Sequence, residues 1–173
     1  MDILAPSYFH VSDHYFRDKM TWSDKQFKAI WRGGTTGGNV GANICRYPGF
    51  DAGVTHHSQF HRQRLFALCS KIEDCDYKFS HYMICHPRCE PLMKDYDPTS
   101  CISMEGQSIN KLIIDIDGNT YSRRFPTLLA TGSVVMKIFA FDDIGVVPAK
   151  PWVHYIPVKM DLSDFEEKLK WAK

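Results

Sequence analysis

Residues 111–173 read KLIIDIDGNTYSRRFPTLLATGSVVMKIFAFDDIGVVPAKPWVHYIPVKMDLSDFEEKLKWAK, and this stretch decides the fold class. Its apolar pattern predicts strands that begin near Lys111, Val134 and His154, with one helix after Ser122 and another after Asp161. Alternating strands and helices predict a parallel sheet covered by helices, an α/β, Rossmann-like architecture. Such sheets bind ligands at the carboxyl ends of their strands.

The composition is that of a globular domain. The chain has 173 residues, of which 44% are hydrophobic and 24% charged, with a net charge of +1. Because this charge creates no global field, nucleic acid is not an expected partner. No apolar run approaches the length of a membrane span, so we expect membrane attachment only through a segment absent from this sequence. The final helix starts close to the last residue, so we expect one partial domain over 1–173.

The first half of the chain carries weaker signals. Phe27–Trp31 predicts a short buried strand, and the following Arg32–Gly41 has five glycines, which predicts a loop that approaches a ligand closely. His56–Ser70 predicts a helix that turns Leu65 and Cys69 inward and carries basic residues near its start or side. Glu73–Ser108 contains three prolines and predicts loops with short elements.

Six cysteines leave two interpretations open. Disulfides in a secretory compartment and free buried thiols explain the count equally well. A zinc site is disfavoured, because the residues close to one another lack a paired C-x2-C framework. Those residues are His81, Cys85, His86 and Cys89. We therefore expect no metal ligand set in the chain.

An anion site is predicted at 118–124. A glycine turn leads into a predicted helix start, whose free N–H groups suit a phosphate. Arg123 and Arg124 would oppose the helix dipole there, which favours a bound anion as their partner. A solvated basic helix start is the alternative interpretation.

Two further motifs are less specific. Gly33 and Gly38 have the spacing of a P-loop, but Asn39 stands where that motif needs lysine, and no GxGxxG pattern occurs in this loop. The alternative interpretation of this glycine-rich segment is a flexible surface loop. Asp115-Ile116-Asp117 has the D-x-D spelling of manganese-dependent sugar transferases, yet aspartates are common before turns. We favour the turn, with Asp117 as an acceptor for a ligand hydroxyl.

Motifs along most of the chain resemble those of one family. They are DG-x3-S-x-R at 117–124, LL-x2-GSVV-x-K at 128–137, PWVHYIPV-x2-DLSD at 151–164, and WRG with TTG at 31–37. Together they resemble glycosyltransferase family 90, the capsule-associated family that includes fungal capsule xylosyltransferases and protein O-glucosyltransferases. The block at 151–164 is the most specific, and the similarity is loosest over 38–110.

The resemblance implies the C-terminal donor-binding lobe of a GT-B glycosyltransferase, in which a donor cleft separates two Rossmann-like lobes. It implies an incomplete lobe, in which Arg32 meets the donor pyrophosphate, and Ser122 and Arg124 are the clearest contacts to a UDP-sugar. Arg64 is a looser match to a second basic position. The predicted donor-binding residues are Arg32, Gly33, Thr36, Arg64, Asp117, Gly118, Asn119, Thr120, Tyr121, Ser122, Arg123, Arg124 and Ser133.

The implied reaction transfers glucose or xylose from a UDP-sugar to a hydroxyl of a glycan or protein acceptor. The family's catalytic carboxylate belongs to an upstream lobe, so no catalytic residue is predicted here. No metal is strictly required, and manganese is an optional addition. The implied compartment is the lumen of the endoplasmic reticulum or Golgi. Two alternatives are a nucleotide-sugar-binding or interaction protein without catalysis, and a zinc-stabilised interaction module at 69–89.

Overall fold

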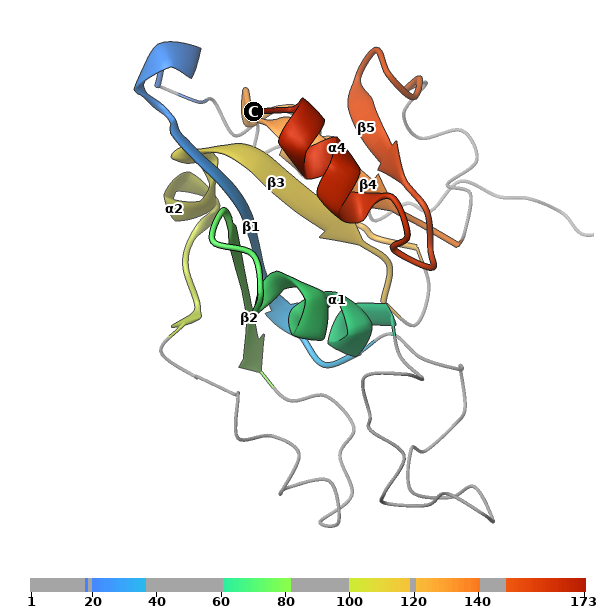
Figure 1. Ribbon diagram of the computed structural model, residues 1–173. Coiled ribbons are helices and arrows are strands. Elements are labelled where there is room, and N and C mark those ends of the chain that lie inside the picture. The colour runs from blue at the N-terminus through green and yellow to red at the C-terminus, as the bar shows by residue number, and fades with distance from the viewer. Residues whose placement is uncertain (1–17, 19, 37–60, 82–99, 119–120, 141–148) are drawn as a thin grey trace, which may run out of the picture.

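The described part of the chain forms one five-stranded sheet with the strand order β2-β1-β3-β4-β5 (Figure 1). The computed structural model describes residues 18, 20–36, 61–81, 100–118, 121–140 and 149–173. Every neighbouring pair of strands is parallel, which confirms the predicted α/β, Rossmann-like class. The strands are β1 (Gln26–Gly34), β2 (Cys75–His81), β3 (Asn110–Ile116), β4 (Val134–Ile138) and β5 (Tyr155–Val158).

Helices cover both faces of this sheet. The helices α1 (His61–Cys69) and α4 (Phe165–Trp171) pack on the face toward the viewer in Figure 1, where Leu65 and Phe165 are fully buried. The helices α2 (Met104–Ser108) and α3 (Phe125–Leu129) lie on the opposite face. A short 3-10 helix, η2 (Trp22–Asp24), precedes β1. The sheet is therefore the middle layer of three.

The central strand β3 is buried on both sides, as a parallel strand between two helical layers must be. Leu112, Ile114 and Ile116 face the core under α1 and α4, and Ile113 faces the core on the other side. None of these four side chains is more than 1% exposed. The apolar run at the start of 111–173 thus becomes the centre of the sheet.

The strand predicted at Phe27–Trp31 is confirmed, but it extends further than expected. β1 continues to Gly34, so Arg32 and Gly33 are paired with β2 instead of opening a loop. Gly33 is required there because the Trp31 indole lies along the strand. A Cβ added at Gly33 would meet the Trp31 Cζ2 atom at 2.5 Å. The glycine serves close packing, and the rest of the predicted glycine loop, 37–41, lies outside the described residues.

One of the short elements expected within Glu73–Ser108 is a strand at Cys75–His81, the edge strand β2. Tyr77 and Phe79 are buried and alternate with more exposed residues, the pattern of a strand with one covered face. Their rings pack around Trp31: Tyr77 stacks on it at 4.2 Å, and Phe79 meets it edge-on at 5.7 Å. The aromatic contacts explain why a strand forms in a cysteine-rich stretch.

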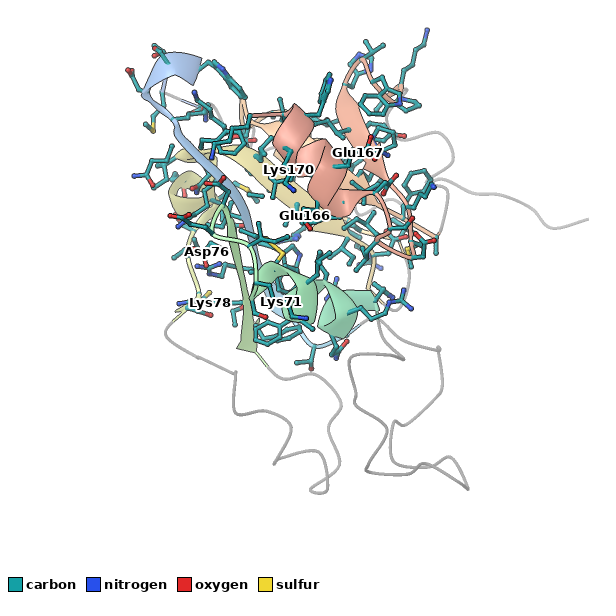
Figure 2. The ribbon with its side chains drawn as sticks, in the orientation of Figure 1. Lys71, Asp76, Lys78, Glu166, Glu167 and Lys170 are labelled. Carbon is teal, nitrogen blue, oxygen red and sulfur yellow. A yellow bond between two sulfur atoms is a disulfide. The ribbon has the colours of Figure 1, made fainter. Side chains whose placement is uncertain are left out.

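Of the two interpretations of the cysteines, disulfides or free thiols, the structure shows a disulfide for one pair. Cys69 at the end of α1 forms a disulfide with Cys75 at the start of β2 (Figure 2). Cys101 is free and exposed, and the other three cysteines lie outside the described residues. Because Cys69 and Cys75 are bonded to each other, they are not available as ligands in the zinc module considered at 69–89.

The charges of α4 follow the helix dipole. Glu166 and Glu167 lie in the first turn, whereas Lys168 and Lys170 lie in the last. Figure 2 shows Glu166 and Lys170 on the outward side of the helix, where they form an ion pair with a separation of 2.8 Å. The buried residues of the same helix are Phe165 and Leu169, so this helix is amphipathic. None of the described helices is long and apolar enough to cross a membrane.

Candidate functional site

The strand order defines where a ligand is expected. From β1 the chain moves outward to β2 on one side, and then returns across the sheet to β3 on the other side. The neighbouring strands β1 and β3 therefore flank the point where the strand order reverses. Doubly wound sheets bind ligands at the carboxyl ends of the strands at such a point. The relevant edge consists of the end of β1 at Gly34 and the end of β3 at Ile116.

Arg62, in the first turn of α1, bridges these two strand ends. Its Nη1 donates to the Gly34 carbonyl at 2.8 Å, and its Nη2 donates to the Ile116 carbonyl at 3.1 Å. Its Nε donates to the Asp117 carbonyl at 3.0 Å, and Nη1 also donates to Thr36 Oγ1 at 2.7 Å. All of these acceptors are uncharged. Within the described part of the chain, no ion pair neutralises Arg62.

Arg124 brings a second guanidinium to the same place. Its Nη1 donates to the Arg32 carbonyl at 2.8 Å, whereas its Nη2 is buried and has no hydrogen-bond partner among the described residues. No ion pair of the described residues includes Arg124 either. An unpaired buried donor on a cation costs free energy, so an anion placed there would be stabilised.

The indole ring of Trp31 packs against both guanidinium groups. The guanidinium carbon of Arg62 is 5.1 Å from the indole centroid, and that of Arg124 is 5.8 Å from it. Contacts of this kind hold a cation without neutralising its charge. Burial lowers the pKa of both arginines, but a guanidinium remains protonated at neutral pH. The site therefore concentrates two positive charges above an aromatic surface.

The turn between β3 and α3 is fixed by two aspartates. Asp117 accepts from the Ser122 N–H at 3.0 Å and from the Ala140 N–H at 2.8 Å. Asp115 accepts from the Ser122 hydroxyl at 2.5 Å and from Lys137 Nζ at 3.0 Å. Neither aspartate is exposed to solvent. These bonds fit the turn interpretation of the D-x-D motif. Among the described residues, no group of three acidic, histidine or cysteine side chains could hold a metal ion.

The helix predicted after Ser122 begins later than expected. Helix α3 starts at Phe125, and Arg124 occupies its N-cap position without a side-chain capping bond. Ser122 does not cap the helix, because its hydroxyl is bonded to Asp115. Because α3 has only five residues, we attribute the positive character of this site to arginine side chains and not to a helix dipole.

Several predicted donor-binding residues meet at this edge. Thr36 bonds to Arg62, and an added Cβ at Gly118 would lie 3.2 Å from both Thr36 Oγ1 and Arg62 Nη2. Ser122 and Arg124 follow in the braced turn. In the same turn Tyr121 is partly exposed and Arg123 is exposed. Two of the predicted positions, Asn119 and Thr120, lie outside the described residues.

Other predicted residues are placed elsewhere. The Arg32 side chain forms an ion pair with Asp76 at 2.7 Å and donates to the Ser100 carbonyl at 2.9 Å, so it already has protein partners. Arg64 donates to the Met160 carbonyl at 2.8 Å, which ties α1 to the turn after β5. Ser133 precedes β4 at the opposite, amino edge of the sheet, where its hydroxyl donates to the Asn110 carbonyl at 2.7 Å.

Two residues of the site were not predicted from the sequence. Arg62 was placed only near the start or side of a helix, and nothing in its local pattern indicated that it bridges two strands. His61 donates from Nε2 to the Asp117 carbonyl at 2.6 Å, and burial lowers its pKa. A basic pair at the start of a helix that follows a glycine-rich loop is the signal that could have identified them.

Comparisons with known proteins place this chain in a family. The sequence model described as Glycosyl transferase family 90 matches residues 12–173. The chain is 25% identical over 173 residues to Uncharacterized protein 035R of Invertebrate iridescent virus 3, covering 93% of this chain and 14% of that protein. It is 45% identical over 64 residues to Protein O-glucosyltransferase 2 of Danio rerio, covering 36% of this chain and 13% of that protein.

A similar match reaches a second glucosyltransferase, Protein O-glucosyltransferase 1 of Rattus norvegicus. Identity is 41% over 64 residues, covering 36% of this chain and 16% of that protein. The matched regions thus represent about a seventh of the length of these curated relatives. Because the family's sequence model matches almost the whole chain, the chain belongs to glycosyl transferase family 90.

Proposed function

We propose that this chain binds the diphosphate of a UDP-sugar at the carboxyl ends of β1 and β3, as the donor-binding portion of a glycosyltransferase. The observation that carries the proposal is the pair of guanidiniums of Arg62 and Arg124, which have no carboxylate partner among the described residues. Arginine suits phosphate oxygens in both charge and geometry. Family membership supports a sugar nucleotide as the source of the phosphates.

The proposed chemistry needs positive charge at this edge. When the bond between the sugar and UDP breaks, negative charge develops on the leaving phosphate. Preorganised cations that face this charge stabilise the transition state more than the ground state. The buried Nη2 of Arg124 is a donor that no group in the described part of the chain accepts from. In this proposal the arginines suffice for the leaving group, and manganese is an optional addition.

The acceptor is proposed to be a hydroxyl of a glycan or protein. A hydroxyl nucleophile needs a general base. The carboxylates of Asp115 and Asp117 already bind the Ser122 turn, so we assign the base to a residue outside the described part of the chain. This division fits a two-lobed GT-B enzyme. Relatives named as protein O-glucosyltransferases favour glucose over xylose as the donor sugar.

Because the carboxylates of Asp115 and Asp117 are both bonded to Ser122, a second function is also a candidate. A chain that holds the donor without offering a base would be a nucleotide-sugar-binding protein with no turnover. Release of glucose or xylose from the corresponding UDP-sugar, with hydroxyl-bearing protein and glycan acceptors, separates the two. Binding without any transfer or hydrolysis would support the second candidate.

A secretory compartment suits either candidate. The disulfide between Cys69 and Cys75 is a bond that persists in oxidising compartments and is rare in the cytosol. We therefore propose the lumen of the endoplasmic reticulum or Golgi as the working environment.

The binding proposal is tested by calorimetry of UDP with Arg124→Ala. Because the variant loses a charged donor at the site, we expect its affinity to fall at least about tenfold. Lys71→Ala is the control, since Lys71 is an exposed cation that follows the last residue of α1, at the opposite end of this helix from Arg62. Its affinity should stay within about twofold of the parent, in line with the small effects of exposed charges. Equal UDP affinity of parent and Arg124→Ala would contradict the assignment.

A further inference from the structure

A buried ion pair adjoins the turn that carries Arg124. Asp115 of β3 and Lys137 of β4 are register partners, and Lys137 Nζ is 3.0 Å from Asp115 Oδ2. The side chain of Asp115 is fully buried, and that of Lys137 is 8% exposed. Lys137 also lies 3.9 Å above the ring of Phe125, the first residue of α3. The pair is thus enclosed between the sheet and the short helix.

Asp115 connects this pair to the turn that carries Arg124. Its Oδ1 accepts from the Ser122 hydroxyl at 2.5 Å, while Asp117 holds the backbone N–H of the same serine. Ser122 is therefore fixed by both its side chain and its backbone. Two residues later Arg124 reaches the Arg32 carbonyl and the Trp31 ring. A change in the Asp115 bond would be transmitted to Arg124 through this short turn.

The charge of Asp115 also bears on Arg124. Burial lowers the pKa of Arg124, and the largest opposing influence is the negative charge of Asp115, which raises it. The negative charge of Asp115 competes with an external phosphate for the same guanidinium. Lys137 removes much of this competition, because it satisfies Asp115 directly. The same reasoning predicts that loss of Lys137 turns Asp115 toward Arg124.

We propose that Asp115 and Lys137 act together as positioning residues for the anion site: Asp115 fixes the Ser122 turn, and Lys137 neutralises Asp115 so that Arg124 remains available to the ligand. This inference rests on the proposed function only for the identity of the ligand. It assigns to the D-x-D motif a role in shaping the site. A purely structural ion pair would affect folding stability and leave the affinity of the folded protein unchanged.

The test compares Lys137→Met with the double variant Asp115→Asn/Lys137→Met in the full chain. Calorimetry with UDP and with inorganic pyrophosphate reports the affinity of the folded protein. In Lys137→Met the unpaired Asp115 competes for Arg124, so both ligands should bind about tenfold more weakly. In the double variant an amide replaces the charge but can still accept from Ser122, so affinity should return to within about threefold of the parent.

Ser122→Ala keeps the experiment decisive if Lys137→Met does not fold. It removes the bond between the turn and Asp115 but leaves the ion pair intact. The expected loss of affinity is about fivefold, with circular dichroism as the check of folding. If the folded Lys137→Met or Ser122→Ala variant binds both ligands as tightly as the parent, the proposal is overturned. Equal losses in Lys137→Met and the double variant would also overturn the neutralising role of Lys137.

Binding of UDP and pyrophosphate by the parent distinguishes a failure of this inference from a failure of the proposed function. If the parent binds pyrophosphate but not UDP, the nucleotide assignment fails, and the pyrophosphate series alone decides on Asp115 and Lys137. If the parent binds neither ligand, no anion site exists at this edge, and both proposals fall.

Discussion

At the scale of single residues, Gly33 decides whether Trp31 can support the arginine pair. In Gly33→Ala the new Cβ would lie 2.5 Å from Trp31 Cζ2, so the indole must move. We expect this overpacking to lower the free energy of unfolding by about 1–3 kcal/mol in urea denaturation. UDP affinity should fall as well, because both guanidiniums pack on the same ring.

Gly106→Ala is the matched control for this substitution. Its added Cβ would meet the Ile102 Cβ at 3.5 Å, an ordinary contact, and Gly106 lies within helix α2. Replacing a helical glycine by alanine is expected to be neutral or to stabilise by up to about 1 kcal/mol. If Gly33→Ala were as stable as Gly106→Ala, the packing assigned to Trp31 would be wrong.

His61 predicts a pH dependence of stability. Burial lowers its pKa in the folded chain below the ordinary value of 6.5, against the opposing effect of the bond to the Asp117 carbonyl. Between these two pKa values the unfolded chain binds more protons than the folded chain, so acidification favours unfolding. The contribution of His61 to the free energy of unfolding should therefore be fully present above pH 6.5. It should decrease as the pH falls below 6.5 and level off below the folded pKa.

The measurement compares the parent with His61→Gln by urea denaturation from about pH 7.5 to pH 5. The free energy of unfolding of the parent should decrease relative to that of the variant as the pH falls. Proton NMR of the parent gives the folded pKa directly. A midpoint for His61 at or above 6.5 would rule out the assigned burial effect.

At the scale of elements, the sequence predicted the strands that have a clear local pattern of apolar residues. The strands at 110–116, 134–138 and 155–158 appear where alternating or continuous apolar residues indicated them. Edge strand β2 was expected only as an unlocated short element, because prolines and cysteines in the surrounding stretch outweighed a short alternation around Tyr77 and Phe79. That alternation becomes decisive only when Trp31 is present to pack against both rings, and this contact spans more than 40 residues of sequence.

The disulfide between α1 and β2 gives a prediction at the same scale. Cys69 and Cys75 are 6 residues apart and join the end of a helix to the start of an edge strand. Closing so short a loop restricts the unfolded chain enough to stabilise the fold by about 2 kcal/mol. We expect Cys69→Ala/Cys75→Ala to lose about this amount in urea denaturation under oxidising conditions.

Cys101→Ala is the control, because Cys101 is exposed and forms no disulfide with a described cysteine. Its free energy of unfolding should stay within about 0.5 kcal/mol of the parent. A double variant as stable as the Cys101→Ala variant would show that the crosslink adds nothing to the fold.

At the scale of the whole molecule, the site arises from topology. The sequence predicted Ser122 and Arg124 at the start of one helix, whereas both precede α3 in the structure. It could not bring Arg62 to them, because Arg62 and Arg124 are 62 positions apart in the sequence. The parallel order β2-β1-β3 closes that distance by placing the ends of β1 and β3 side by side. The same topology sends Ser133 to the opposite edge, since the residue precedes its strand instead of following it.

A ligand that bridges β1 and β3 should stabilise the whole sheet. Binding to the folded state alone adds about 2.7 kcal/mol when UDP is present at 100 times its dissociation constant. For a chain of this size that corresponds to a rise in melting temperature of about 5–10 °C. Uridine lacks the phosphates that the arginines are proposed to contact, so at equal concentration its shift should be close to zero.

Hydrogen exchange locates the effect within the molecule. Amides near Gly34–Thr36 and near Asp117 should gain the most protection from UDP, because Arg62 ties these two segments together. Amides around Ser133, at the far edge, should gain only what global stabilisation gives to every residue. Equal thermal shifts with uridine and UDP, or protection concentrated at the Ser133 edge, would move the ligand away from the arginine pair.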